Sequence, residues 1–171
     1  MESLPSGIQY RHWPVDDAKA CVLLAHGLAE HTGRYEHVAA RLNERGVAVV
    51  GPDHIGHGAS PGMRVYLKAF SEYLEPMQTL RAHIDDWYPG RPVFLMGHSM
   101  GGLISAHLLL ISQAAFQGAM LSGPAFHAVD PAPAPLMLIG RLLRYVLPKL
   151  GMVSLDANGV SRDPAVVADY L

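Results

Sequence analysis

Four short apolar runs, each bounded by Gly, Pro or polar residues, alternate along this chain with segments of helical periodicity. The runs are Ala20–Ala25, Val47–Val50, Val93–Met96 and Ala119–Leu121. Runs this short and this uniformly apolar are typical of strands buried on both faces of a parallel sheet. Alternation of such strands with helices requires crossover connections, which are right-handed in nearly all proteins. The sequence therefore predicts an α/β fold with a mostly parallel sheet and helices on both faces.

Three helices are expected between these strands. Apolar residues recur at i, i+3, i+4 and i+7 from Tyr35 to Leu42, and Gly46 follows where a helix C-terminus favours glycine. A second apolar period runs from Leu67 to Trp87 and stops before Pro89-Gly90. A third segment, Leu103–Ile111, is apolar almost all round, which predicts a helix buried on most sides.

Composition indicates a compact globular protein. Of 171 residues, 50% are apolar and 16% are charged, which excludes a disordered or charge-driven chain. The formal net charge is −2, so there is no basic field to bind a phosphate backbone, and a nucleic-acid partner is not expected. The single cysteine, Cys21, lies in an apolar run and is interpreted as a small buried hydrophobe.

The first residues contain neither the basic segment nor the apolar segment of a secretory signal, which together with the lone cysteine predicts a cytoplasmic protein. The longest lipophilic stretch, Leu136–Leu150, contains three basic residues and is shorter than the roughly 20 residues of a transmembrane helix. Residues 131–135 alternate proline with alanine, and an apolar helix is expected over Leu136–Leu147. We therefore expect a core over residues 1–127 and a helical cap over 128–171.

The most specific motif is Gly97-His98-Ser99-Met100-Gly101-Gly102, a G-x-S-x-G directly after the third apolar run. The composition predicts roughly 0.1 chance matches, even before a strand and a helix are required on its two sides. A strand that turns abruptly into a helix strains the serine and leaves no space for Cβ atoms at the glycines. The motif predicts that Ser99 lies above the carboxyl edge of the sheet as a nucleophile, with the Met100 amide directed at a developing oxyanion.

Two further motifs follow the first and second apolar runs. The first is His26-Gly27-Leu28-Ala29-Glu30-His31, and the second runs from Asp53 to Ser60 and contains two histidines three residues apart. No H-E-x-x-H pattern, cysteine ligand or carboxylate cluster completes a metal site, so no metal is expected. We interpret Asp53 and the glycines after it as a tight hydrogen-bonded loop at the border of a pocket.

Together the motifs resemble the α/β-hydrolases of the monoacylglycerol lipase and lysophospholipase group, which are often classed with serine aminopeptidases. That group carries H-G-x-x-E-H-x-x-R-Y, then D-x-x-G-H-G-x-S, then G-H-S-M-G-G. This chain has the same patterns at 26–35, 53–60 and 97–102. The resemblance runs from about Tyr10 to the last residue and implies an α/β-hydrolase fold with the beginning of a helical cap.

The resemblance also implies a serine hydrolase of lipophilic carboxylic esters that needs no cofactor. Ser99 would be the acyl nucleophile, and the backbone N–H groups of Leu28 and Met100 would form the oxyanion hole. Polar and supporting residues around the oxyanion turn and the pocket would be His26, Gly27, Glu30, Arg34, Asp53 and His98. The apolar cap would shape an acyl channel and could contact a membrane or a micelle.

The chain departs from this pattern after Ser99. The triad of the fold runs Ser, acid, His in chain order, but the first acidic residue after Ser99 is Asp130 and the last histidine is His127. A serine without a base is a weak nucleophile. We interpret the sequence as the N-terminal part of a longer hydrolase and expect negligible esterase activity from these 171 residues alone. An aminopeptidase of the same fold and a non-catalytic module that binds an apolar ligand are the alternatives, and the oligomeric state is left open.

Overall fold

The computed structural model describes residues 1–127 and 162–170. The chain divides into two compact units, Met1–Ala128 and Val129–Leu171. In the second unit, helix α5 spans Pro164–Tyr170. The proline-alanine segment and the helix expected over Leu136–Leu147 lie outside the described residues.

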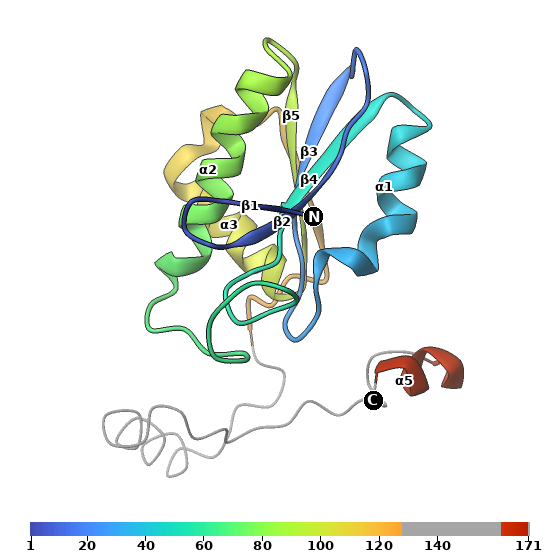
Figure 1. Cartoon of the computed structure of the whole chain (residues 1–171), viewed down its shortest axis with the longest axis vertical. Coiled ribbons are helices and arrows are strands. Elements are labelled where there is room, and N and C mark those ends of the chain that lie inside the picture. Colours follow the sequence, from blue (N-terminus) through green and yellow to red (C-terminus); the bar gives the residue numbers. More distant parts are fainter. Residues whose placement is uncertain (128–161, 171) are drawn as a thin grey trace. The chain divides into compact units, whose positions relative to one another are not determined.

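The first unit contains a six-stranded sheet of order β1-β2-β4-β3-β5-β6 (Figure 1). Four neighbouring strands are parallel, as the alternating pattern predicted: β3 (Ala20–Ala25), β4 (Val47–Pro52), β5 (Val93–His98) and β6 (Gly118–Ser122). Two antiparallel strands extend the sheet beyond β4: β1 (Glu2–Ser3) and β2 (Gln9–Trp13). These two were not predicted, because β1 is very short and β2 is mostly polar.

The predicted helices are present on both faces of the sheet (Figure 1). One face carries the 3-10 helix η1 (Thr32–Tyr35) and helix α1 (Glu36–Asn43). The other face carries α2 (Ser71–Trp87) and α3 (Met100–Ser112), the latter followed by the short 3-10 helix η2 (Gln113–Ala115). Gly46, after α1, has a left-handed φ of 75°, as expected for a glycine beyond a helix C-terminus.

Strand β3 shows why the central strands are apolar at every position. Its alternate side chains Cys21, Leu23 and Ala25 belong to the cluster that contains the buried residues of α2 and α3. The intervening Val22 and Leu24 belong to the cluster on the α1 side. Successive strand residues point to opposite faces, so both faces of β3 are buried. Cys21 is buried as predicted, and burial raises the pKa of its thiol to about 12.

Two predictions about burial are wrong. Strand β6 is not buried on both faces, since Met120 is 45% exposed, and α3 is not buried on most sides, since Leu110 is 83% and Ile111 58% exposed. Within the described ranges, β6 pairs with β5 alone and forms one edge of the sheet. No described layer packs beyond this edge, so apolar residues here remain accessible.

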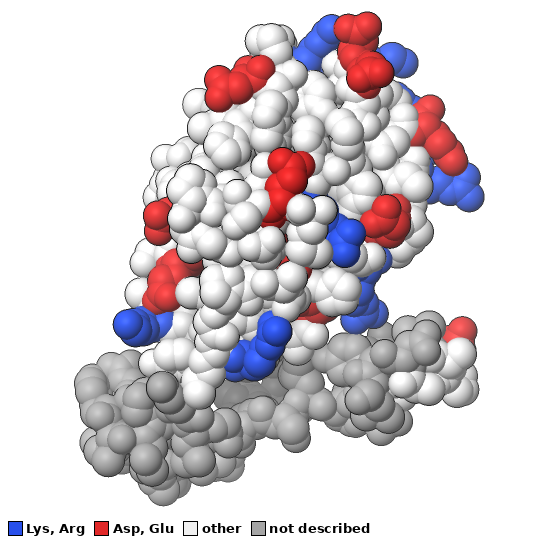
Figure 2. All heavy atoms as spheres, viewed as in Figure 1, with Lys and Arg blue, Asp and Glu red and all other residues white. Residues whose placement is uncertain are grey.

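Charged side chains of both signs are interspersed over the face of the molecule seen in Figure 2. This distribution agrees with the small net charge of −2. Among the helices of residues 1–127 and 162–170, none is both long and apolar enough to cross a membrane.

Candidate active site

Ser99 is the residue between β5 and α3. This junction lies at the carboxyl ends of the parallel strands (Figure 1). The Ser99 φ of 51° and ψ of −116° are a backbone conformation that residues with a side chain rarely adopt. The Ser99 amide donates to the Ser122 carbonyl at 2.9 Å, and the Ser99 carbonyl accepts from the amides of Gly102 and Ala125, each at 3.0 Å. These bonds hold the strained residue between α3 and the segment that follows β6.

Glycines leave the space that this junction requires. A Cβ on Gly101 would come closer than 3.0 Å to the backbone oxygens of Ala25 and His26, and one on Gly97 would collide with the Gly101 carbonyl. The first turn of α3 therefore rests directly on the end of β3. This close approach is the physical reason for the glycine spacing around Ser99.

Relief of the strain at Ser99 gives a first prediction. The variant Ser99→Gly should raise the free energy of unfolding by about 1 kcal/mol, because strain of ~1–3 kcal/mol is removed and only part is offset by the larger entropy of an unfolded glycine. Urea unfolding measures the change. The matched variant Ser112→Gly, at a residue with an ordinary φ of −148°, should instead lower the stability. Equal destabilisation by both changes would contradict backbone strain at Ser99.

Two backbone amides beside Ser99 are available to bind an oxyanion. The parallel register pairs Ala25 with Gly97, so the turn after β3 lies next to the Ser99 junction. Within the described part of the chain, the amides of Leu28, in this turn, and of Met100, the first residue of α3, donate no hydrogen bond. The Met100 amide also lies at the positive end of the α3 dipole. Such an arrangement can stabilise negative charge on a carbonyl oxygen under attack by the serine hydroxyl.

The turn after β3 is held by the carboxylate of Glu30. This carboxylate accepts hydrogen bonds from the Gly27 amide at 2.5 Å and from the Tyr35 hydroxyl at 2.6 Å, and it pairs with the Arg34 guanidinium at 3.5 Å. The Glu30 side chain is 10% exposed, whereas that of Arg34 is 42% exposed. Burial and the Glu30 hydrogen bond both raise the pKa of Tyr35. The predicted polar residues Glu30 and Arg34 are thus brought together at the turn.

Beneath the turn lies a buried group of three histidines. His26 is fully buried; its Nδ1 donates to the Gly27 carbonyl at 2.7 Å, and its Nε2 accepts from the His54 amide at 2.9 Å. These partners assign a neutral ring with the proton on Nδ1. Burial lowers the pKa of His26 to about 4, and burial also lowers the pKa values of His54 and His57. The His26 Nε2 lone pair is occupied, so this ring is not available as a base.

Asp53 ties the end of the turn to the loop after β4. The residue is 1% exposed, and its carboxylate accepts from the Thr32 amide at 2.9 Å, from the Thr32 hydroxyl at 2.6 Å and from the Ala59 amide at 2.9 Å. Burial opposes ionisation of Asp53, but these hydrogen bonds outweigh it and lower its pKa. The carboxylate therefore links the end of the turn after β3 to the loop after β4 through hydrogen bonds.

The remaining predicted residue, His98, is exposed, and its ring is held against the end of β6. Its Nδ1 donates to the Ser122 carbonyl at 3.0 Å and lies 3.2 Å from the Ser122 hydroxyl. Sequence reasoning missed Ser122, Thr32 and Tyr35 as polar partners. Tyr35 is the last residue of the first motif, so the motif could have indicated it. Thr32 and Ser122 contact residues 21 and 24 positions away, and no local sequence pattern indicates such contacts.

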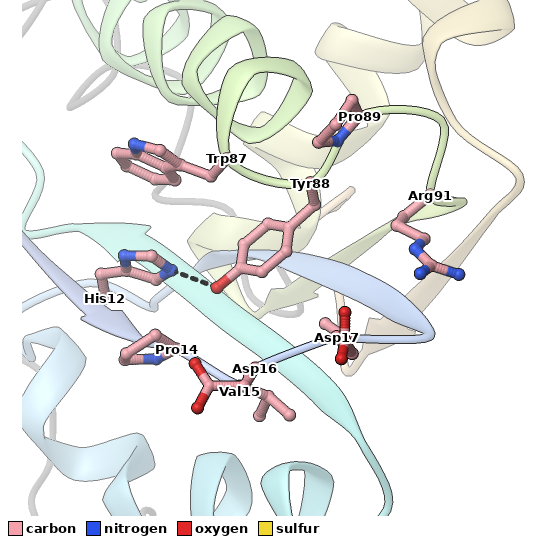
Figure 3. A pocket seen from close by; sticks show the side chains of 10 residues that line it. His12, Pro14, Val15, Asp16, Asp17, Trp87, Tyr88, Pro89 and Arg91 are labelled. Atoms are coloured by element: carbon pink, nitrogen blue, oxygen red, sulfur yellow. Dashed lines mark hydrogen bonds between the residues drawn. The ribbon is translucent and has the colours of Figure 1, made fainter.

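A different cleft, of about 450 Å³, lies at the amino ends of β3 and β5, whereas Ser99 lies at the carboxyl end of β5 (Figure 3). In it the His12 ring stacks on Trp87 and is hydrogen-bonded to the Tyr88 hydroxyl at 2.8 Å. The described lining of this cleft includes no Ser, Thr or Cys, so it has no counterpart of the Ser99 hydroxyl. Within the described ranges, no cluster of three or more His, Cys, Asp and Glu is suited to a metal ion.

Known proteins match both the sequence and the fold. A family profile described as serine aminopeptidase, S33, matches residues 16–171. A monoacylglycerol lipase of Mycolicibacterium smegmatis is 42% identical over 95% of this chain and 59% of its own length. Human monoglyceride lipase is 35% identical over 94% of this chain and 54% of its own. The crystal structure of Paleococcus ferrophilus monoacylglycerol lipase superposes with a TM-score of 0.81 at 28% identity, over 95% of this chain and 61% of that one.

These matches confirm the resemblance inferred from the three motifs and the α/β-hydrolase fold that it implied. The chain spans 54% to 61% of the length of the relatives it matches here.

Proposed function

Because the chain belongs to the serine aminopeptidase S33 family of α/β-hydrolases, we propose that it carries the nucleophile and the oxyanion hole of a serine hydrolase acting on lipophilic esters. The observation that supports this most directly is the strained Ser99 beside the unbonded amides of Leu28 and Met100. The relatives named monoacylglycerol lipase and monoglyceride lipase support an ester with a single acyl chain, of the monoacylglycerol or lysophospholipid type.

In the proposed reaction, the Ser99 Oγ adds to the carbonyl carbon of the ester while a base accepts the hydroxyl proton. The bond from carbon to the alcohol oxygen then breaks, the alcohol leaves with that proton, and the acyl group remains esterified to Ser99. Water adds to this acyl-enzyme in the same way, which releases the fatty acid and restores the serine. In both halves the amides of Leu28 and Met100 donate to the oxygen that carries the negative charge.

The 171 residues alone should nevertheless turn over esters negligibly. The only histidines after Ser99 are His107 and His127, and both precede Asp130, so the Ser, acid, His order is not met. His107 lies on α3, where its ring packs against Phe70 with centroids 4.6 Å apart. Assistance by a general base contributes roughly 10²–10⁴-fold to such a reaction. We propose that a longer polypeptide supplies this base and its acid.

Ester turnover and chemical rescue of labelling test the assignment together. With p-nitrophenyl butyrate, the purified chain should release nitrophenol no faster than its Ser99→Ala variant. A fluorophosphonate should react slowly, and added imidazole should accelerate the reaction because it replaces the missing base. Mass spectrometry should locate the phosphonate adduct on the peptide that contains Ser99. The adduct should persist in Ser122→Ala, the matched control.

Two results would contradict different parts of this proposal. Rapid ester turnover that Ser99→Ala abolishes would mean that these residues contain their own base. An adduct that survives Ser99→Ala, or that requires Ser122, would remove Ser99 as the nucleophile.

The family description favours one second candidate, an aminopeptidase. A pair of phosphonate probes, one with a long alkyl chain and one with a free amine of amino-acid type, separates the two substrate classes. The alkyl probe should label Ser99 faster, because residues 128–171, which we assign to a cap, are rich in apolar side chains between 136 and 147. Faster labelling by the amine probe would favour the peptidase. The proposed cap would also contact a membrane or micelle surface on which such lipids reside.

A further inference from the structure

We infer that His26 is a positioning residue that sets the direction of the Leu28 oxyanion donor, an inference that rests on the proposed function of the turn after β3. The Gly27 carbonyl and the Leu28 N–H belong to one planar trans peptide, so they point in opposite directions. The His26 Nδ1–H holds the Gly27 carbonyl at 2.7 Å.

Burial determines the direction in which this peptide points. His26 is fully buried, so the Gly27 carbonyl must point into the protein to reach the ring. The Leu28 N–H then points away from the buried ring, and within the described residues it donates to no acceptor. A flip of this peptide would leave the buried His26 Nδ1–H without a partner. The ring therefore excludes the orientation in which Leu28 could not serve as a donor.

The ring itself cannot turn freely, because it is held at its other nitrogen. His26 Nε2 accepts from the His54 amide at 2.9 Å, on the loop after β4. The Gly27 amide is fixed independently by the Glu30 carboxylate. Both ends of the Gly27 residue are thus bonded to side chains of the same motif. Only the neutral ring with its proton on Nδ1 satisfies both of its partners.

Protonation of the ring would break this arrangement. A proton on Nε2 would face the His54 N–H, so the ring would have to move and release the Gly27 carbonyl. The ionisable groups that face the ring are His54 and His57, with centroids 4.3 and 5.4 Å from it, together with the carboxylates of Asp53 and Glu30. The protonation state of His26 and the direction of the Leu28 donor are therefore coupled.

Nuclear magnetic resonance of the 171-residue chain, labelled with ¹⁵N, tests this without requiring catalysis. At pH 7 the His26 ring should show a protonated Nδ1 and an unprotonated Nε2. Each of two variants removes one of the two hydrogen bonds of the ring and keeps the other. In His26→Asn the side-chain amide can keep the donor to Gly27 but lacks the distant acceptor, so the His54 amide signal should move and the Leu28 signal should stay. In His26→Gln, which reaches the Nε2 position only, the Leu28 signal should move and the His54 signal should stay.

The Trp87 indole signal, from the opposite edge of the sheet, should be unchanged in both variants and reports that the fold is kept. A Leu28 amide that is unchanged in folded His26→Gln would overturn the inference, as would equal movement of both amides in both variants. If the variants do not fold, a wild-type ring protonated on Nε2 at pH 7 overturns it. Because none of these signals depends on Ser99, failure of serine labelling would leave this result intact and is distinguishable from it.

Discussion

Gly101→Ala should lower the free energy of unfolding of the first unit by about 3 kcal/mol or more, the upper range for an added methyl group in a packed interior. The new Cβ would lie closer than 3.0 Å to the carbonyl oxygens of Ala25 and His26. Both oxygens belong to the backbone at the end of β3, which is paired on both sides within the sheet. Since β3 cannot yield, α3 must shift, and the Ser99 junction must shift with it.

Urea unfolding followed by circular dichroism measures this loss. The matched control is Gly118→Ala in β6, where the added Cβ would meet only the Phe94 ring at 3.4 Å. That side chain can move by a few tenths of an ångström, so the control should lose less than about 1 kcal/mol. A Gly101→Ala protein as stable as the control would show that the junction tolerates a side chain there. The steric account of the motif would then be wrong.

Acid should remove a comparable amount of stability, about 3 kcal/mol, between pH 6.5 and pH 4. Burial lowers the pKa of His26 from 6.5 to about 4, so the unfolded chain binds a proton more readily than the folded one. The stability from the neutral ring is complete above pH 6.5 and is lost as the pH falls to about 4. The two pKa values differ by about 2.5, which corresponds to about 3 kcal/mol. His54 and His57, whose pKa values are also lowered by burial, add to the loss.

Urea unfolding at a series of pH values from 7.5 to 4 checks this prediction. The slope of stability against pH should be reduced in His26→Gln and retained in His37→Gln, which changes an exposed histidine of α1. The lowered pKa of Asp53 affects stability only below its ordinary value of 3.8, which is outside this pH range. A stability that does not change between pH 6.5 and 4 would mean that the buried histidines accept protons without cost.

The parallel strands were predictable because each carries its signal in consecutive residues. β3 is apolar at all six positions since both of its faces are buried, and the motif around Ser99 has its glycines where the chain must turn without Cβ atoms. β2 had no such signal, because its polar residues pair with β4 through backbone groups that any residue possesses. The exposure of Leu110 and Met120 was equally invisible, since apolarity does not reveal whether a further layer covers a residue.

The amino-acid sequence by itself determined the α/β class, the strand–turn–helix junction at Ser99 and the family resemblance, because these depend on local sterics and on the order of short motifs. Only the tertiary structure decided that Asp53 binds Thr32, that Ser122 binds His98, and that His26 carries its proton on Nδ1. The first two hydrogen bonds join residues more than 20 positions apart. The position of the His26 proton depends on the distant His54 amide. Hydrogen bonds of this kind are selected by the packing of strands and loops, which no local pattern records.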